Sequence, residues 1–307
     1  MGRKKRKVKF YALAMAVAML FTGTGNVIYV AEAATYETDN LDDMYRKYDL
    51  ETGEVTLVPR YSVPSYSRGE RVTCTEPYIP AEVTQQENIG RALIGVYERT
   101  PVTNTSTYPY RAIAQLEMVY ADGTTGQGTG FMVSSNVMLT AGHCCMSRNN
   151  AAVNSITVNL GRNGDSVVKV TTVSSYYVCA NYNYFGDSVQ DDYAILVLSE
   201  DVGDITGWFG LGYSTNSFFY NNEFAITGYP GDKTYGTMWK ATGDIENCTT
   251  YELHYYMDMY PGQSGSPIYT NSYVAYGINV AETSTMNYGR RMTQEVFDWL
   301  LDQGFIS

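Results

Sequence analysis

Short apolar segments separated by turn-forming residues run through most of this 307-residue chain and restrict the folds open to it. The segments end at Gly, Asn or Asp and succeed one another at intervals of roughly 8–25 residues, with turns instead of helices between them. They predict β-strands at residues 111–120, 130–134, 137–140, 156–160, 167–173, 193–198, 223–227, 253–257, 267–269 and 275–280. This spacing is typical of an antiparallel sandwich or barrel, so we predict an all-β fold.

Only the C-terminal end has helical spacing. Thr293 is a suitable N-cap, and an apolar stripe precedes Gly304, formed by Val296, Phe297, Leu300 and Leu301. We therefore predict a helix over residues 293–303. The Tyr-, Asn- and Gly-rich stretches 174–191 and 203–222 have weak periodicity and are expected to be long loops, the second of which links two halves.

The N-terminus has the layout of a secretory signal peptide. Residues 3–9 hold six basic side chains, residues 10–21 are apolar apart from one hydroxyl, and Ala31-Glu32-Ala33 is a small-x-small cleavage signature. The apolar run is too short to span a bilayer, which needs roughly 20 residues. We predict that residues 1–33 are removed and that the exported protein keeps no stable membrane association. The alternatives are an uncleaved anchor and a nuclear-type signal.

Residues 34–91 differ in composition from residues 92–307, which follow them. They are rich in charged and turn-forming residues, among them Asp42-Asp43 and Arg68-Gly69-Glu70-Arg71, and they show no sustained period. A stretch of this kind cannot bury much apolar surface by itself. We interpret it as a propeptide, with a disordered linker as the alternative.

Residues 92–307 have the composition of a packed domain. They carry 9 basic and 20 acidic side chains, a net charge of −11. Nucleic acids and anionic membranes bind basic surfaces, so this charge argues against both as partners. The length is sufficient for one all-β unit of two barrels.

The five cysteines do not form a tidy disulfide framework. Cys74 lies in the predicted propeptide, and four remain beyond it, Cys144, Cys145, Cys179 and Cys248. Four cysteines allow three pairings, and Cys179 with Cys144 or Cys145 is one candidate pair in an exported protein. No spacing resembles a metal site, and two histidines exclude a multi-histidine zinc cluster.

A glycine-rich turn presents a candidate nucleophile. Ser264 lies in the run Pro261-Gly262-Gln263-Ser264-Gly265-Ser266-Pro267, where the backbone can turn sharply and approach a substrate carbonyl. The amides of Gly262 and Ser264 can point into one pocket and stabilise an oxyanion. A serine hydroxyl is a poor nucleophile without an adjacent base, so by itself this run is simply a turn.

His143 and Asp192 are the candidate partners of Ser264. His143 comes after an apolar strand and a small-residue turn, whereas the other histidine, His254, lies within a predicted strand and is expected to be a barrel residue. Asp191 and Asp192 directly precede an apolar strand. Asp192 adjoins the strand and is the better candidate, with simple solvation as the alternative for one of the two. Base, orienting carboxylate and nucleophile thus occur in the order His, Asp, Ser.

With these residues in place, the chain resembles the chymotrypsin-fold serine proteases, and among them the secreted glutamyl endopeptidases of Gram-positive bacteria. The resemblance covers almost all of residues 92–307 and rests on motifs in a fixed order. These are Ile94-Gly95, Val102-Thr103-Asn104-Thr105, Tyr108-Pro109-Tyr110-Arg111-Ala112-Ile113, Thr140-Ala141-Gly142-His143-Cys144, Asp192-Tyr193, Gly228-Tyr229-Pro230-Gly231-Asp232-Lys233, Gly262-Gln263-Ser264-Gly265-Ser266-Pro267 and Thr293-Gln294-Glu295-Val296-Phe297-Asp298.

The resemblance implies two six-stranded antiparallel β-barrels with the active site in the cleft between them, followed by the C-terminal α-helix. The first barrel would span about 105–205 and supply His143 and Asp192. The second would span about 206–290 and supply Ser264.

The resemblance also implies a secreted zymogen. An activating protease would cut after Arg91, so that the mature chain begins near Ala92 and its new N-terminus helps to build the specificity pocket. No cofactor is implied, and a monomer that acts on protein or peptide substrates is expected.

The residues expected at the specificity pocket depart from the pattern of the family. The family binds a substrate Glu with a His and a Thr, and the matching positions here hold Asn279 and Met259. A buried carboxylate without a charge partner is costly, so we predict that Glu is not the preferred residue. Asp258 and Glu282 would favour Arg or Lys if they face the pocket, and Met259 would favour an apolar residue. Alternatively, Asp258 is a strand residue that faces away from the pocket.

A second departure concerns Cys144. Its disulfide partner in the family would stand near Gly128, so the usual bridge beside the candidate base is expected to be absent. Cys145 or Cys179 could compensate, and the candidate triad is unaffected.

Two other functions could use the same chain. One is a degenerate protease-fold protein that binds host or cell-surface proteins, and the other is an esterase that shares the mechanism. The presence of His143, Asp192, Ser264 and Gly262 favours peptide hydrolysis over the binding protein. An esterase is expected to place its serine between a strand and a helix of an α/β chain, which the all-β pattern argues against.

Overall fold

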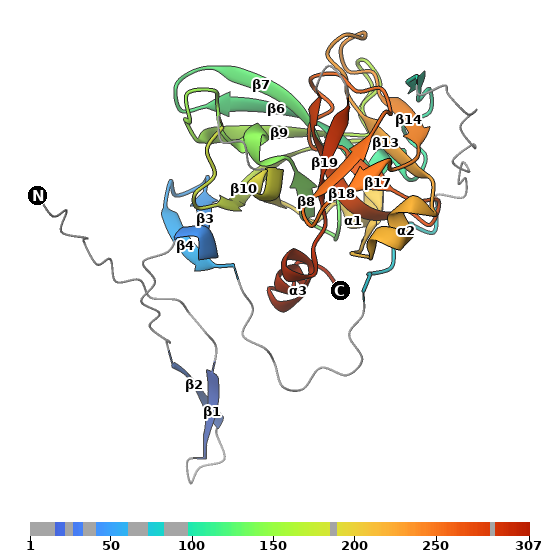
Figure 1. Ribbon diagram of the computed structural model, residues 1–307. Helices are drawn as coiled ribbons and strands as arrows, with labels where there is room; N and C mark the ends of the chain where they lie inside the picture. Colours follow the sequence, from blue (N-terminus) through green and yellow to red (C-terminus); the bar gives the residue numbers. More distant parts are fainter. Residues whose placement is uncertain are drawn as a thin grey trace, which may run out of the picture.

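Strand pairing divides the structure into two large β-sheets that lie side by side (Figure 1). The computed structural model describes residues 41–60, 73–82, 98–184, 189–282 and 286–307, with the side chains of 281–282 left out. It also gives the backbone of a two-stranded sheet, β1 (Ala16–Phe21) and β2 (Val27–Glu32). Arg91 and Ala92, where cleavage is predicted, lie outside the described residues. None of the described helices is long and apolar enough to cross a membrane.

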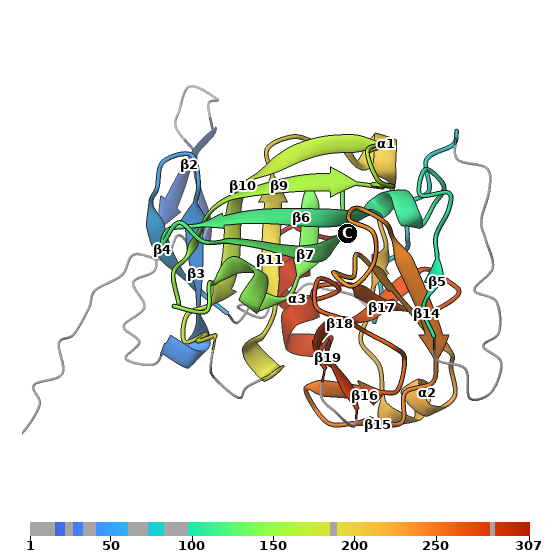
Figure 2. The same cartoon turned by 90° about the horizontal axis from the view of Figure 1, so that it is seen from above.

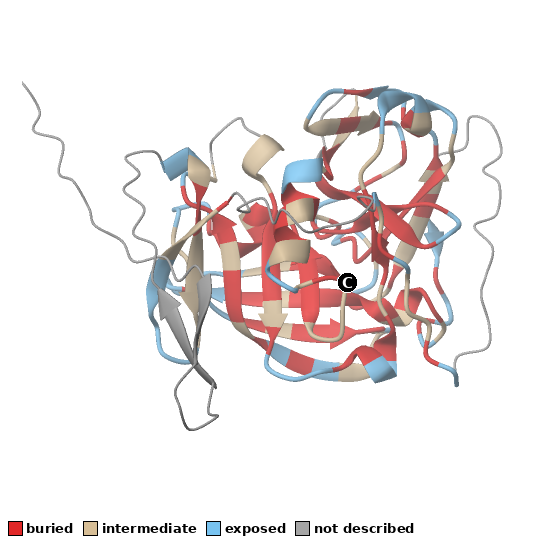
Figure 3. Cartoon of the chain, turned by 90° about the horizontal axis from the view of Figure 1, so that it is seen from below, coloured by how far each residue is buried: buried red, intermediate tan, exposed pale blue. Residues whose placement is uncertain are grey.

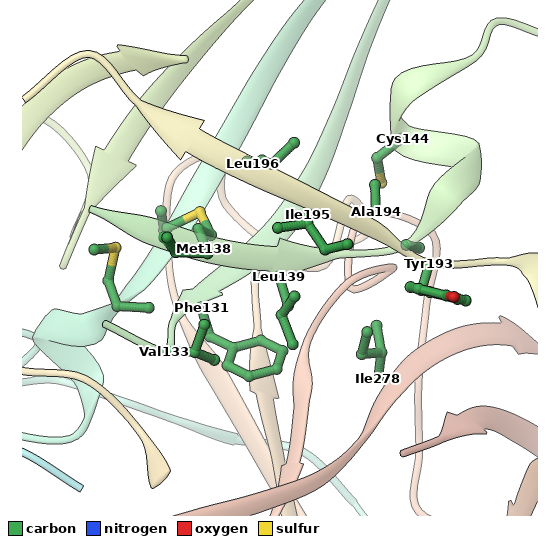
Figure 4. Close-up of a cluster of buried hydrophobic side chains, with 14 of the residues drawn as sticks. Phe131, Val133, Met138, Leu139, Cys144, Tyr193, Ala194, Ile195, Leu196 and Ile278 are labelled. Atoms are coloured by element: carbon green, nitrogen blue, oxygen red, sulfur yellow. The ribbon is translucent and has the colours of Figure 1, made fainter. Parts of the chain in front are cut away.

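The first sheet contains a closed six-stranded barrel. Its strands are β6 (Ile113–Tyr120), β7 (Thr125–Met132), β8 (Val137–Thr140), β9 (Val153–Leu160), β10 (Lys169–Cys179) and β11 (Ala194–Leu198). They are arranged in the order β11-β8-β7-β6-β9-β10, and pairing of β10 with β11 closes the ring. Buried side chains of β7, β8 and β11 pack together, with Ile278 of the second sheet in the same cluster (Figure 4).

The second sheet is open in its described strand pairing. Its strands are β5 (Thr100–Pro101), β12 (Gly210–Leu211), β13 (Phe224–Gly228), β14 (Trp239–Gly243), β15 (Asn247–Cys248), β16 (Glu252–Tyr255), β17 (Pro267–Tyr269), β18 (Val274–Glu282) and β19 (Asn287–Arg291). The strand order is β15-β16-β19-β18-β17-β13-β14-β5. The two-residue strands at its ends, β15 and β5, do not pair with each other in the described structure, so this sheet forms a half-barrel. The predicted all-β fold is confirmed, and buried residues line both sheets (Figure 3).

The helices are short. The predicted C-terminal helix is confirmed as α3 (Gln294–Asp302). Thr293 stands at its N-cap position without a side-chain cap hydrogen bond, and the apolar stripe is buried except for the partly buried Leu301. The stretch predicted as a linking loop contains α1 (Gly203–Thr206) and α2 (Asn216–Tyr220).

The predicted loop over residues 174–191 is wrong at its start, because β10 continues to Cys179. Tyr176 and Val178 lie on the inner face of this strand and are buried, whereas Tyr177 between them is only partly buried. Tyrosines therefore stand on both faces of the strand, and this hides its alternation in the sequence.

Part of the predicted propeptide adds two strands to the first sheet (Figure 2). After the 3-10 turn η1 (Leu41–Asp43), β3 (Met44–Asp49) pairs with β10, and β4 (Val55–Pro59) pairs with β3. We call η1, β3, β4 and Arg60 the pro-hairpin. The disordered-linker alternative does not describe these residues, because Tyr45 is buried in the core of the barrel and Tyr48, Leu50 and Val58 pack partly buried against it.

Candidate active site

His143 lies in a tight turn after β8. The turn η3 (Gly142–Cys145) is a single piece of 3-10 helix. A Cβ atom at Gly142 would lie 3.0 Å from the backbone nitrogen of Tyr193 and 3.2 Å from Oδ1 of Asp192, so glycine allows the turn to pack against the segment that carries Asp192. The imidazole keeps 20% of its side-chain surface exposed.

Asp192 holds both the ring and the backbone of His143. It lies between η4 (Val189–Asp191) and β11. Its Oδ2 lies 2.9 Å from Nδ1 of His143, and its Oδ1 accepts a hydrogen bond from the His143 backbone N–H at 2.9 Å. A carboxylate at Nδ1 favours a proton on that nitrogen, which leaves Nε2 as the acceptor of a further proton.

The same contact raises the pKa of His143. Burial of the ring lowers this pKa, but the negative charge of Asp192 and its hydrogen bond outweigh burial and hold the pKa above its ordinary value. Asp192 therefore stabilises the imidazolium, which is the form that a general base has after it accepts a proton.

The candidate nucleophile turn is attached to the first sheet by Thr129 of β7. The Thr129 N–H donates to the carbonyl of Ser264 at 2.8 Å, and its hydroxyl donates to the carbonyl of Gly262 at 2.9 Å. Gly262 and Gly265 have positive φ values of 101° and 90°, and a Cβ atom at Gly265 would lie 1.9 Å from the Thr129 carbonyl oxygen. This close approach requires glycine. The role of Thr129 was not predicted, because nothing in the local sequence marks it.

The amide groups of the turn fall into two sets. Those of Gln263, Gly265 and Ser266 donate to backbone carbonyls within or beside the turn. Those of Gly262 and Ser264 donate to no group in the described part of the chain. These are the two amides that the sequence predicted for an oxyanion site.

The structure brings Ser264 close to the His143 turn without joining the two functional groups. The sulfur of Cys144, the residue after His143, lies 3.8 Å from the carbonyl oxygen of Ser264. No hydrogen bond links the Ser264 hydroxyl to the imidazole among the described contacts. Such bonds are often long in free enzymes and shorten when substrate binds. A cavity of about 310 Å³ adjoins His143 and is also lined by Tyr120, Gln127, Arg148 and Tyr184.

Asp258 is not a free acid of the specificity pocket. Nε of Arg99 donates to Oδ2 of Asp258 at 2.8 Å, and the Arg99 guanidinium also binds both oxygens of Asp232. Asp258 therefore has a cationic partner within the chain, and its effect on a substrate Arg or Lys stays a prediction. Arg99 was missed because it meets Asp258 only after β5 pairs with β14, far along the chain.

Asn279 supports the nucleophile turn. Its Nδ2 donates to the carbonyl of Gln263 at 2.9 Å, and its Oδ1 accepts from the hydroxyl of Tyr255 at 2.5 Å. Its side chain therefore already has a donor and an acceptor partner. Met259 is buried in the core of the second sheet. Glu282 ends β18, and its side chain lies outside the described residues.

The other titratable residues singled out in the sequence lie apart from this turn. His254 is on β16 and pairs with Glu252, with Nε2 and Oε2 2.8 Å apart. Asp191 forms an ion pair with Arg60 at 2.8 Å, and 23% of its side chain is exposed, so solvation alone does not describe it. Its partner comes from the predicted propeptide and could not be read from the local sequence.

All five cysteines are free thiols, so the candidate pairing of Cys179 with Cys144 or Cys145 is not formed. A Cβ atom at Gly128 would lie 2.7 Å from the sulfur of Cys144, which shows that the thiol fills the space beside this glycine. Burial raises the pKa of the Cys144 thiol to about 12. A buried thiol of this kind is unreactive.

Comparison with known proteins agrees with this geometry. A family model described as Trypsin matches residues 102–299. A relative named Glutamyl endopeptidase from Bacillus licheniformis is 38% identical over 220 residues, which are 68% of this chain and 67% of the relative. A Bacillus subtilis relative named Extracellular metalloprotease is 35% identical over 212 residues, covering 67% of this chain and 68% of that protein.

A solved structure of a Glu endopeptidase in complex with MPD superposes with a TM-score of 0.60 at 25% identity, covering 68% of this chain and 98% of that one. The described residues contain no group of three or more His, Cys, Asp or Glu side chains that could hold a metal ion. The chain belongs to the trypsin family, and it is a serine endopeptidase similar to the bacterial glutamyl endopeptidases.

Proposed function

We propose that this chain is a secreted serine endopeptidase, made as a zymogen, in which Ser264, His143 and Asp192 form the catalytic triad. The proposal rests on the contacts of the Asp192 carboxylate with both Nδ1 and the backbone N–H of His143. This contact fixes the tautomer and orientation that a general base needs.

The proposed reaction proceeds through an acyl-enzyme. His143 takes the proton of the Ser264 hydroxyl at Nε2 as the serine oxygen attacks the substrate carbonyl, and it then gives that proton to the leaving amine. The amides of Gly262 and Ser264 bind the oxyanion. Water, activated again by His143, releases the acid product. No cofactor takes part in this scheme.

A fluorophosphonate probe tests the proposal directly. We expect covalent labelling of the processed protein, with the modified peptide containing Ser264, because only an activated serine attacks the phosphorus centre. Mass spectrometry of a digest locates the label. A processed protein that stays unlabelled would contradict the triad and favour the alternative, a degenerate protease-fold binding protein.

Secretion and activation belong to the same proposal. Support comes from the basic and apolar layout of residues 1–33 and from the motifs that resemble a mature chain starting at Ala92. The expected partners are protein or peptide substrates and a protease that cuts after Arg91, with the mature enzyme acting as a monomer.

We expect a substrate preference for an uncharged residue before the scissile bond. Asp258 is paired with Arg99, and Asn279 is a neutral amide whose oxygen and nitrogen already bind Tyr255 and Gln263, so neither is an unpaired charge for a substrate. A fluorogenic peptide library that varies this residue measures the preference. If Glu, or Arg and Lys, gave clearly the highest kcat/KM, the expectation would be wrong.

A further inference from the structure

The pro-hairpin extends the first sheet at the point where β10 no longer pairs with β9. β10 pairs with β9 only over residues 169–172, and β3 pairs with β10 over Ser175–Cys179. Backbone hydrogen bonds extend this contact at both ends, from Ala180 N to Met44 O and from Leu50 N to Ser174 O, each at 2.8 Å. Without the pro-hairpin, this part of β10 would expose an unpaired strand edge.

Aromatic side chains attach the pro-hairpin to the barrel and to α3. Tyr45 is 1% exposed and lies 4.5 Å from Trp299 between ring centroids, while Tyr48 stacks on Tyr176 at 4.6 Å. The indole N–H of Trp299 donates to the carbonyl of Pro59 at 2.8 Å. Departure of the pro-hairpin would remove both this acceptor and the Tyr45 ring that packs on the indole.

A buried ion pair lies at the end of the pro-hairpin. Arg60 is 5% exposed, and its guanidinium pairs with Asp191 and donates to the hydroxyl of Tyr193 at 3.4 Å. The Tyr45 and Tyr193 hydroxyls lie 2.6 Å apart. The pro-hairpin therefore contacts the residues on either side of Asp192. Removing one partner of a buried ion pair is strongly destabilising.

The pro-hairpin does not cover the candidate catalytic residues. Among the described contacts, none of its hydrogen bonds, ion pairs or ring contacts reaches His143, Gly262 or Ser264. Residues 73–82, the other described part of the predicted propeptide, pair through Cys74 with Gly212 and through Tyr78 with Trp208. Substrate access and retention of the pro-hairpin are therefore compatible.

We propose that the pro-hairpin stays on the enzyme after cleavage at Arg91, as a non-covalent second chain that supports the loop of Asp192. This inference rests on the proposed zymogen. The pro-hairpin acts as a structural partner of the barrel rather than as a plug of the active site.

Retention can be tested without enzyme activity. The full chain with Ser264→Ala, which cannot digest itself, is cut by limited trypsin treatment and passed through a size-exclusion column, and each peak is identified by intact mass. We expect a fragment that contains residues 41–60 to elute with residues 92–307 in equal amounts. Elution of that fragment apart from the larger one would overturn the proposal, whether or not the larger one stays folded.

A pair of variants tests the contact that carries most of the inference. In the Ser264→Ala background, Arg60→Met should release the fragment on the order of 100-fold faster after dilution, because Asp191 loses its buried partner. Arg46→Met is the matched control, since Arg46 lies half-buried on β3 and forms no described ion pair. Equal release by the two variants would show that the Arg60 contact does not retain the fragment. If Arg60→Met does not fold, elution of the Ser264→Ala chain still decides retention.

These measurements separate the two proposals. Labelling of the wild-type chain by the fluorophosphonate reports the triad alone, and co-elution of the cut Ser264→Ala chain reports retention alone. Failure of either leaves the result of the other intact.

Discussion

Replacement Ser264→Ala is expected to lower kcat for peptide hydrolysis by roughly 10⁵–10⁶-fold, the scale seen when another serine protease loses its nucleophile. Alanine removes the hydroxyl and keeps the backbone that Thr129 and Asn279 hold in place. KM should change little, because the groups that bind the peptide remain. Steady-state kinetics on a fluorogenic peptide measures both constants.

The same turn offers a matched control. Ser266 is fully buried, and its hydroxyl has no hydrogen-bond partner among the described atoms. Ser266→Ala removes an equal group two residues away and should keep kcat within about threefold, since an unpaired buried hydroxyl contributes little. Equal loss in both variants would indicate damage to the turn and would contradict the assignment of Ser264.

Replacement Asp192→Asn is expected to lower kcat by about 10⁴-fold at neutral pH, as the same change does in a related protease. The amide would donate to Nδ1 of His143 and place the ring proton on Nε2, where the serine proton must go. The substitution also removes the charge that raises the pKa of His143 while the burial that lowers it remains. The acid limb of the kcat/KM profile should therefore move to lower pH.

A pH series of kcat/KM for both proteins checks this direction. Asp201→Asn serves as the control, because Asp201 is exposed beyond the opposite end of β11 and bonds only Ser135 in the described contacts. It should leave both the rate and the profile unchanged. An acid limb that stays in place in Asp192→Asn would show that Asp192 does not set the pKa of His143.

Local patterns were sufficient to predict most strands, the C-terminal helix and the contact between His143 and Asp192. Each of these features is marked within a few residues: a strand by its apolar run, the helix by its N-cap and stripe, and Asp192 by the strand directly after it. The assignment of Ser264 as nucleophile stays a prediction until the variants are measured.

Features that depend on distant partners could not be predicted in this way. Arg99 is an unremarkable basic residue until β5 brings it to Asp258, 159 residues later. The pro-hairpin has too little apolar surface to indicate order, and it is held by the edge of β10 and by the side chains around it. Composition indicates how much apolar surface a segment can bury by itself, whereas the pro-hairpin buries its side chains against the first barrel.

Thr129 has a consequence for the order in which the molecule assembles. Thr129 belongs to the first sheet, yet its N–H and hydroxyl donate to the carbonyls of Ser264 and Gly262. Its hydroxyl also accepts from the N–H of Tyr229, and all three partners belong to the second half of the chain. The turn can take its final shape only when the two halves have docked. A chain whose two halves have not yet docked would therefore carry every residue of the candidate site without its geometry.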